Sequence, residues 1–419
     1  MEYLLRGDIC YSENLKTLIC KENAYLHIKD GLCQGVYDSL PKELSSVEIK
    51  DYSGDLILPG MVDLHLHAPQ YGFRGTKMDL ELLDWLNVNT FPEEAKYQNL
   101  DYAERGYQDF VEDLRGSATT RAVIFATLHK DATLLLMKLL EESGLVSYVG
   151  KVNMDRNSPE YLTEHTAEES LKNTKEWLSE IPKEWQNCKP ILTPRFTPTC
   201  SDALMEGLGK LAKEYKLPVQ SHLSENPGEI AWVKELCPDA KHYGDTYDRY
   251  GLLENSIMAH CVYTEGEELS ALKSRGTMIC HCPQSNTNLC SGAAPIRYFL
   301  EENVKVGLGT DVAGGANLSM LRAITDAISV SKLRFRLMDQ SLSPLTLEEA
   351  FCLATLSGGS FFGKVGSFLP GYEADALVFH EKRRSVRKQT VKERLEVLLY
   401  TGEESARLQA KFVQGRQLF

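Results

Sequence analysis

Residues 58–67 read LPGMVDLHLH, an apolar run that ends in two histidines. Continuous apolarity over four to eight residues is typical of strands buried on both faces, as in a parallel sheet. Eight such runs alternating with amphipathic helical stretches predict a (β/α)8 barrel. A doubly wound open sheet is the rival fold, although no Gly-rich phosphate loop follows a strand. The other seven runs are RAVIFATLH (121–129), SYVGKVNM (147–154), PILTPRF (190–196), LPVQSHL (217–223), SIMAHCV (256–262), TMICHCP (277–283) and VKVGLGTD (304–311).

The two ends of the chain have a different pattern from the middle. Short alternating strands broken by Gly- and Asn-rich turns occupy both ends, as in NAYLHIKDGLCQGVY (23–37) and ARLQAKFVQGRQLF (406–419). Because sequence typical of short strands and turns flanks the barrel on both sides, we expect one small β-sandwich domain built from both termini. The expected division is residues 1–57 and 365–419 for this β-domain and 58–364 for the catalytic barrel.

Composition excludes several classes of protein. The 419 residues are 43% hydrophobic and 25% charged, which is ordinary for a globular chain and argues against disorder. The net charge of −13 disfavours nucleic acid and anionic membranes as partners. No apolar run approaches the roughly 18 residues that span a bilayer, and the charged N-terminus does not resemble a signal peptide. Eleven scattered cysteines are an odd number and indicate reduced thiols, so we expect a cytoplasmic protein.

Histidines gather at the ends of the predicted strands. His65, His67, His222 and His260 lie at the ends of strands 1, 5 and 6, and Asp311 ends strand 8. The C-terminal ends of barrel strands converge on one mouth, so these side chains should form a single cluster. His65 and His67 are two residues apart in a strand and therefore point to the same face. Imidazole nitrogens with one carboxylate suit Zn²⁺ or Fe²⁺, leaving a position open for water.

Other histidines and cysteines have competing interpretations. Cys280, His281 and Cys282, with Cys290 nearby, could form a separate zinc knuckle, but they lack the paired C-x₂-C spacing of structural zinc sites. We interpret the remaining histidines as core or solvent-facing residues: His27, His129, His165, His242 and His380.

Five stretches resemble the amidohydrolase superfamily, and the resemblance extends over essentially the whole chain. Within that superfamily, Gln70, the Arg195–Phe196 pair and the segment from Ser221 to Glu225 resemble the enzymes that deaminate guanine. The resemblance implies a hydrolase that converts guanine to xanthine and ammonia, with one Zn²⁺ per subunit (Fe²⁺ as the alternative), and a homodimer. The stretches are PGMVDLHLHAPQY (59–71), SHLSEN (221–226), MAHCVY (258–263), HCPQSNTNLCSG (281–292) and GLGTDVAGG (307–315).

The resemblance also implies a role for each site residue. It implies that the metal ligands are His65, His67, His222 and Asp311, that the catalytic residues are Glu225, His260 and Asp311, and that the substrate, a purine base, contacts Gln70, Arg195, Phe196, His222, Glu225 and Asp311.

Hydrolytic deamination is chemically reasonable with these residue types. A bound Zn²⁺ lowers the pKa of water from about 15.7 towards 7, which supplies a nucleophile at neutral pH. Glu225 can carry protons to N3 of guanine and to the leaving amino group, and Asp311 can accept the proton of water. His260 can stabilise the developing tetrahedral oxygen. Arg195 can donate to the carbonyl oxygen O6, Gln70 can bind the ring edge, and Phe196 can cover a face of the base.

Each of these assignments has a structural alternative. Arg195 could pair with an acidic loop, Phe196 could serve packing alone, Gln70 could lie at the rim, and Glu225 could be a solvated carboxylate at a helix start. Lys151 on strand 3 could be taken for the carboxylated lysine that bridges two metals in some relatives. That lysine belongs to strand 4 in most of them, and PILTPRF contains none, so we expect one metal and interpret Lys151 as an interior or rim residue.

Three other functions stay open from the sequence alone. The first is deamination or hydrolysis of another aminated heterocycle, such as 8-oxoguanine, a pterin, an adenosine-like compound, cytosine or a triazine. The second is hydrolysis of a cyclic amide, which usually needs the bridging lysine. The third is a non-catalytic barrel protein, against which the intact ligand set and Glu225 argue.

Overall fold

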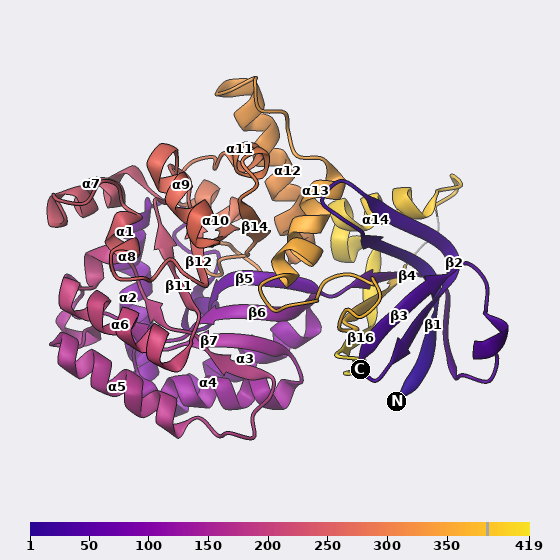
Figure 1. The fold of residues 1–419 in the computed structure, drawn as a ribbon, viewed down its shortest axis with the longest axis horizontal. Helices are drawn as coiled ribbons and strands as arrows, with labels where there is room; N and C mark the ends of the chain where they lie inside the picture. The colour runs from indigo at the N-terminus through magenta and orange to yellow at the C-terminus, as the bar shows by residue number, and fades with distance from the viewer. Residues whose placement is uncertain (383–384) are drawn as a thin grey trace.

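The computed structural model describes residues 1–382 and 385–419 and shows a barrel with a smaller sheet beside it (Figure 1). Eight parallel strand positions form the barrel, and two of them are interrupted. They are β5 (Met61–His67), β6 (Thr119–Phe125), β7 with β8 (Val146–Gly150 and Val152–Asn153), β9 with β10 (Cys188–Pro190 and Thr193–Pro194), β11 (Val219–Leu223), β12 (Ser256–His260), β13 (Met278–His281) and β14 (Lys305–Leu308).

The barrel closes through backbone hydrogen bonds between its sheet segments. Leu192 accepts a bond from the backbone N–H of Gln220 at 2.9 Å, which joins the fourth strand position to β11. At the other seam, the N–H of Asp311 donates to the carbonyl of His65 at 2.8 Å, and the N–H of His67 donates to that of Val312 at 2.7 Å. These bonds exclude the open-sheet alternative and confirm the expected (β/α)8 class.

Helices surround this barrel, as Figure 1 shows. Their starts follow ordinary capping rules: the side chain of Ser201 accepts a bond from Leu204 N, and Thr166 does the same for Glu169 N. The helices are α3 (Leu100–Gly116), α4 (Lys130–Ser143), α5 (Ala167–Glu180), α6 (Asp202–Tyr215), α7 (Pro227–Leu236), α8 (Asp245–Asp248), α9 (Gly266–Arg275), α10 (Pro283–Asn288), α11 (Ile296–Glu301), α12 (Met320–Leu337) and α13 (Leu347–Cys352). No helix in the described part of the chain has the length and apolar character needed to cross a membrane.

Small and branched side chains fill the barrel interior. Val62 and Leu64 of β5 lie in one buried cluster with Val123 of β6 and with Ile257 and Ala259 of β12. Side chains of this size let eight strands pack around a solid centre, so the polar site is confined to the mouth.

A seven-stranded sheet combines both ends of the chain. Its strand order is β17-β16-β15-β4-β1-β2-β3, and one of its faces buries Tyr3, Leu26 and Phe412 in a core of its own. This sheet confirms the small β-domain expected from both termini, and it lies beside the barrel in Figure 1. Its elements are β1 (Glu2–Ser12), β2 (Leu18–Lys29), β3 (Leu32–Tyr37), β4 (Ile49–Pro59), β15 (Ala376–Glu381), β16 (Ala406–Val413) and β17 (Arg416–Gln417), with helix α14 (Val391–Thr401) packed against β1, β2 and β4.

Residues 68–98, which we call the mouth segment, follow β5 and contribute to the site at the barrel mouth. The segment is a chain of short helical turns with Trp85, Phe91 and Tyr97 buried. Five turns compose it: η2 (Ala68–Phe73), α1 (Leu82–Trp85), the π-helical turn η3 (Leu86–Thr90), α2 (Phe91–Glu94) and η4 (Ala95–Gln98).

Candidate active site

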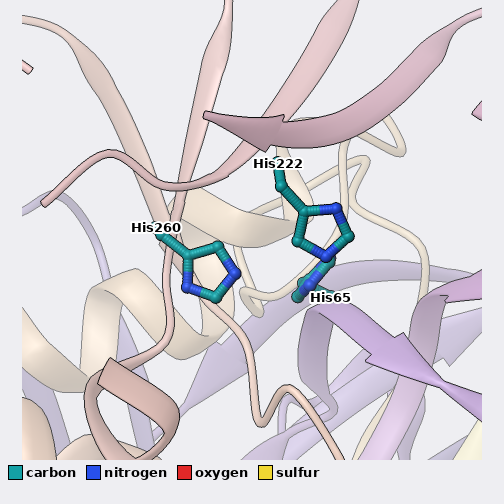
Figure 2. Close-up of side chains that lie close together, drawn as sticks. All are labelled: His65, His222 and His260. Atoms are coloured by element: carbon teal, nitrogen blue, oxygen red, sulfur yellow. The ribbon is translucent and has the colours of Figure 1, made fainter. Parts of the chain in front are cut away.

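The four residues expected to bind metal converge at the mouth of the barrel. The Nε2 atoms of His65 and His67 are 3.3 Å apart, and Nε2 of His222 lies 3.3 Å from that of His67. Asp311 Oδ1 lies 3.2 Å from His65 Nε2 and 3.3 Å from His67 Nε2. Figure 2 shows how the rings of His65, His222 and His260 lie close together, although they come from β5, β11 and β12. The structure thus brings together residues that are up to 246 positions apart in the chain.

Two local features hold the ends of β5 and β14 in this arrangement. The carboxylate of Asp63 accepts bonds from Thr310 N at 3.0 Å, from Thr310 Oγ1 at 2.5 Å and from His65 N at 3.3 Å. A Cβ atom on Gly309 would lie 2.6 Å from the Cys280 sulfur and 3.0 Å from the Cβ of His65. Glycine is therefore needed where the chain after β14 approaches β5, two residues before Asp311.

The spacing of the four ligand atoms fits a metal ion. Zinc–nitrogen and zinc–oxygen bonds of about 2.0–2.1 Å in a tetrahedral site give ligand–ligand separations of about 3.3–3.4 Å. Four of the six separations, those of the pairs His65–His67, His67–His222, His65–Asp311 and His67–Asp311, are 3.2–3.3 Å. Three imidazole nitrogens and one carboxylate oxygen at such separations can share one cation.

The protonation states of these groups also suit a cation. Burial lowers the pKa of His67 to about 4 and holds that of His222 well below its ordinary value. The Nδ1–H of His222 donates to the Arg195 carbonyl at 2.6 Å, which leaves the lone pair of Nε2 directed at the cluster. For Asp311, burial would raise the pKa, but His65 and His67 hold it well below the usual carboxyl range. Neutral imidazoles and an ionised carboxylate are the forms that bind metals.

His260 lies beside this cluster and points at two carboxylates. Its Nε2 is 3.4 Å from Glu225 Oε2 and 3.8 Å from Asp311 Oδ2. The preceding Ala259 faces the barrel interior, so strict alternation would direct His260 outward. The left-handed backbone of His260, with φ 72°, breaks that alternation. Nδ1 of the ring is 2.8 Å from Oδ1 of Asn286, which fixes the ring orientation.

Glu225 is a buried carboxyl group aimed at the same space. It is 3% exposed, so the interpretation as a solvated helix-start residue is wrong. Ser291 Oγ donates to its Oε1 at 3.2 Å, and its backbone N–H donates to Glu229 Oε2 at 3.0 Å. Burial, and then the charge of Asp311, raises the pKa of Glu225 well above the ordinary carboxyl value. A carboxyl group with a raised pKa can exchange a proton near neutral pH.

A concave pocket adjoins these groups, as is usual for small-molecule sites. Its lining combines polar groups of the candidate metal-ligand cluster (His65, His67, His222 and Asp311) with apolar side chains of the mouth segment. Its lining is His67, Gln70, Leu82, Trp85, Leu86, Arg195, Phe196, His222, Glu225, His260, Leu289, Asp311 and Gly314.

Gln70 and Arg195 line the cavity and share a partner that the sequence interpretation did not assign. Arg195 donates through both terminal nitrogens to Glu94, at 2.6 and 3.1 Å. Gln70 Nε2 donates to the same carboxylate at 2.8 Å, and its Oε1 accepts from Ala313 N at 3.3 Å. Arg195 therefore pairs with an acidic residue, as the alternative interpretation of the sequence predicted. It also lines the cavity. Gln70 is 2% exposed, so it is not a solvated rim residue.

Lys151 does not reach the metal-ligand cluster. Its Nζ donates to Glu164 Oε1 at 2.7 Å and to the Val152 carbonyl at 3.1 Å, and the pair is buried. Lys151 does not line the cavity. The fourth strand position contains Lys189, in β9, but this residue does not line the cavity either. The residues present fit a site for one metal.

The zinc-knuckle alternative has no geometric support. The sulfurs of Cys280 and Cys282 are 3.8 Å apart inside the barrel, whereas Cys290 is exposed. Of the five histidines assigned to core or solvent, His27 pairs with Glu2 and His380 with Asp55, both away from the cavity.

Sequence reasoning missed the residues that support the site from behind. Asn286 and Ser291 lie within HCPQSNTNLCSG, and Glu94 lies within LLDWLNVNTFPEEAKYQN. The first stretch contributed to the family resemblance, so a signal for Asn286 and Ser291 was present. Nothing in the sequence distinguished Glu94 from the adjacent Glu93, because only the three-dimensional contact with Arg195 separates them.

Comparison with known proteins gives a consistent result. Guanine deaminase of Rattus norvegicus is 44% identical over 343 residues, covering 80% of this chain and 75% of that protein. Guanine deaminase of Escherichia coli is 36% identical over 413 residues, covering 95% and 91%. The crystal structure of guanine deaminase from C. acetobutylicum with bound guanine in the active site matches this fold with a TM-score of 0.97, at 43% identity over 100% of both chains. The amidohydrolase family model matches residues 56–404, so the chain belongs to the amidohydrolase family, whose members are metal-dependent hydrolases.

Proposed function

We propose that this chain hydrolyses guanine to xanthine and ammonia. The observation that carries the proposal is a single cavity lined by three sets of groups: the candidate metal-ligand side chains, the buried acid Glu225, and the N–H donors of Gln70 and Arg195. Similarity to guanine deaminases over nearly the whole chain supports the same substrate.

We further propose that His65, His67, His222 and Asp311 hold one Zn²⁺, with Fe²⁺ as the alternative that the same ligands accept. A divalent cation bound there lowers the pKa of water to near 7 and so supplies a nucleophile for attack on an aromatic carbon. The absence of a lysine from the cluster supports one metal per subunit, because carboxylated lysine is the bridging ligand of the two-metal relatives.

Glu225 moves protons in this proposal. The amino group that leaves guanine is bonded to C2, and N3 is the adjacent ring nitrogen. Protonation of N3 makes C2 electrophilic, and a second proton delivered to the amino group releases ammonia. Glu225 is suited to both transfers because its pKa is raised by burial and its carboxyl group lies 3.4 Å from His260 at the cavity wall.

Asp311 and His260 act on the attacking water. Asp311 Oδ1 faces the histidine cluster, which leaves Oδ2, on the side of His260, free to accept a proton from water. Nε2 of His260 has no hydrogen-bond partner among the described residues although it is buried, so a polar group of the substrate or water completes its bonding. That position lets His260 stabilise the tetrahedral oxygen as it forms.

Recognition of the base falls to Gln70, Arg195 and Phe196, which also line the cavity. The free N–H groups of Arg195 and Gln70 donate to the carbonyl edge of guanine, and Phe196, which is 4% exposed, covers one face of the ring. We also propose a homodimeric, cytoplasmic enzyme of purine catabolism, on the strength of the family resemblance and of cysteines that are all free thiols.

A panel of aminated heterocycles tests the substrate assignment. Purified protein is incubated with guanine, 8-oxoguanine, a pterin, adenosine and cytosine, and ammonia release and ultraviolet absorbance are followed. We expect guanine to give the highest kcat/KM and xanthine as product. A higher kcat/KM on another heterocycle would replace guanine as the substrate, and no ammonia from any of them would contradict deaminase function.

A further inference from the structure

Glu94 is a buried carboxylate at the boundary between the mouth segment and the barrel. It ends α2, is 1% exposed, and lies behind the cavity wall rather than in its lining. It accepts three hydrogen bonds, two from Arg195 and one from Gln70, at 2.6–3.1 Å. Both of the residues that it holds line the cavity, and they come from different elements of the barrel mouth.

Resting on the proposed function, we propose that Glu94 is a positioning residue that sets specificity at C6 of the purine. By binding Arg195 and Gln70 from behind, it turns their remaining N–H groups toward the cavity. The part of the cavity wall formed by Arg195 and Gln70 then offers donors, which match a ring carrying a carbonyl group at C6 and oppose one carrying an amino group there.

The orientation of Gln70 supports this inference. Its amide nitrogen donates to Glu94, and its oxygen accepts from Ala313 N at 3.3 Å. A flipped amide would place its oxygen against the carboxylate and its NH₂ group against an N–H, so both contacts would be lost. Gln70 therefore keeps one N–H for a ligand.

The bonds of Arg195 lead to the same result. A guanidinium group has five N–H donors and no acceptor, and only two of the five are directed at Glu94. The planar fork is bound by both carboxylate oxygens, so its plane is fixed. The cation also lies over the Phe91 ring of the mouth segment, 5.1 Å from the centroid. Glu94 thus neutralises the arginine without blocking the donors that face the cavity.

A carboxylate is required for this role because it accepts bonds only. Glutamine at position 94 has the same shape but would turn an NH₂ group toward Arg195 or Gln70, placing donor against donor. Gln70 could then satisfy the new NH₂ group only by flipping, which would present its oxygen to the ligand. The expected result is a wall that no longer discriminates between carbonyl and amino groups at C6.

The test compares guanine with 2,6-diaminopurine, which has the same amino group at C2 and an amino group in place of the carbonyl at C6. Hydrolysis at C2 of either base consumes one water and releases one ammonia. Kinetic constants for both bases are measured for the wild type, Glu94→Gln and Glu93→Gln. Glu93 is the matched control because it is the adjacent carboxylate and pairs with Lys96 instead of the site residues.

We expect Glu94→Gln to lower kcat/KM for guanine by roughly 10- to 100-fold, mainly through KM, in line with the loss of charge-assisted hydrogen bonding. The value for 2,6-diaminopurine should fall less, so the preference for guanine should drop by about 10-fold or more. Metal content should be unchanged, and Glu93→Gln should behave as the wild type does. Equal losses on both bases, or a loss confined to kcat, would overturn the inference and leave Glu94 a structural residue.

The two failures can be told apart. If the proposed function is wrong, the wild type does not turn over guanine; if only this inference is wrong, the ratio of kcat/KM for guanine to that for 2,6-diaminopurine is the same in Glu94→Gln as in the wild type. If Glu94→Gln is not recovered folded, Glu94→Asp replaces it. Aspartate keeps the charge and withdraws the carboxylate by one methylene, so the same rise in KM and the same loss of preference are expected. An unchanged preference in Glu94→Asp would overturn the inference.

Discussion

Replacing Glu225 by glutamine separates proton transfer from every other role of this side chain. The carboxyl group is buried, accepts one bond from Ser291 and faces Nε2 of His260 at 3.4 Å. Glutamine has the same volume, and its oxygen can accept the Ser291 bond, so no cavity and no unpaired charge are created. What it lacks is a proton that can be exchanged.

The expected effect is a fall in kcat of about 10²- to 10⁴-fold, or roughly 2.7–5.4 kcal/mol of barrier, which is the usual contribution of general acid–base catalysis. Folding should not suffer. Burial raises the pKa of Glu225 above 4.5, so the folded state binds this proton more tightly than the unfolded state does. Stability from this group therefore declines as the pH rises above 4.5, and the Glu225→Gln protein, which has no such group, should be at least as stable at neutral pH.

The assay is steady-state conversion of guanine to xanthine, with direct binding of guanine to the slow variant and elemental analysis for metal. Glu235→Gln is the matched control, since this exposed glutamate lies on α7, the helix that follows Glu225, and outside the cavity. Near-normal kcat in Glu225→Gln would refute the proton-transfer role. A loss of metal along with activity would show that Glu225 acts on the metal site instead.

Three further outcomes are expected. Arg195→Ala should raise KM for guanine by roughly 10- to 150-fold, and an unchanged KM would weaken the guanine assignment. Because this change leaves Glu94 buried without its cation, it should also lower the free energy of unfolding by about 3–5 kcal/mol in chemical denaturation. Lys151→Met should destabilise similarly by isolating Glu164, with metal content still at one per subunit, and two metals in the wild type would contradict the mononuclear site. In pH–rate profiles, kcat/KM should fall with rising pH along a limb above pH 4.5, because burial raises the pKa of Glu225 and its protonated form is needed to protonate N3; a flat profile from about pH 5 to 9 would argue against this.

The sequence was most informative where one physical rule links pattern to position. Short apolar runs are typical of buried strands, and barrel strands end at a common mouth. The sequence therefore predicts that His65, His222 and Asp311 lie together. The fold class and the metal-dependent hydrolase family are confirmed by the structure and by similarity to known proteins. The domain division at 57/58 and 364/365 stays a prediction.

Contacts without a sequence rule were not predictable. Glu94 lies in short helical turns whose path over the barrel depends on burial of Trp85 and Phe91, and no spacing rule relates it to Arg195, 101 residues away. The left-handed backbone of His260 is equally invisible in the sequence, because such conformations are imposed by the surrounding packing. The strand ends could therefore be assigned, whereas the wall that recognises the base could be assigned only in part.

The most direct measurement of the central claim is ammonia release from guanine by the purified protein, before chelation, after chelation, and after Zn²⁺ is returned, for the wild type and for Asp311→Ala. We expect stoichiometric xanthine and ammonia from the wild type, loss of activity on chelation, recovery with Zn²⁺, and a folded Asp311→Ala protein that binds no metal and has no activity. Full activity in the chelated wild type, or full metal content in Asp311→Ala, would contradict a metal site formed by His65, His67, His222 and Asp311.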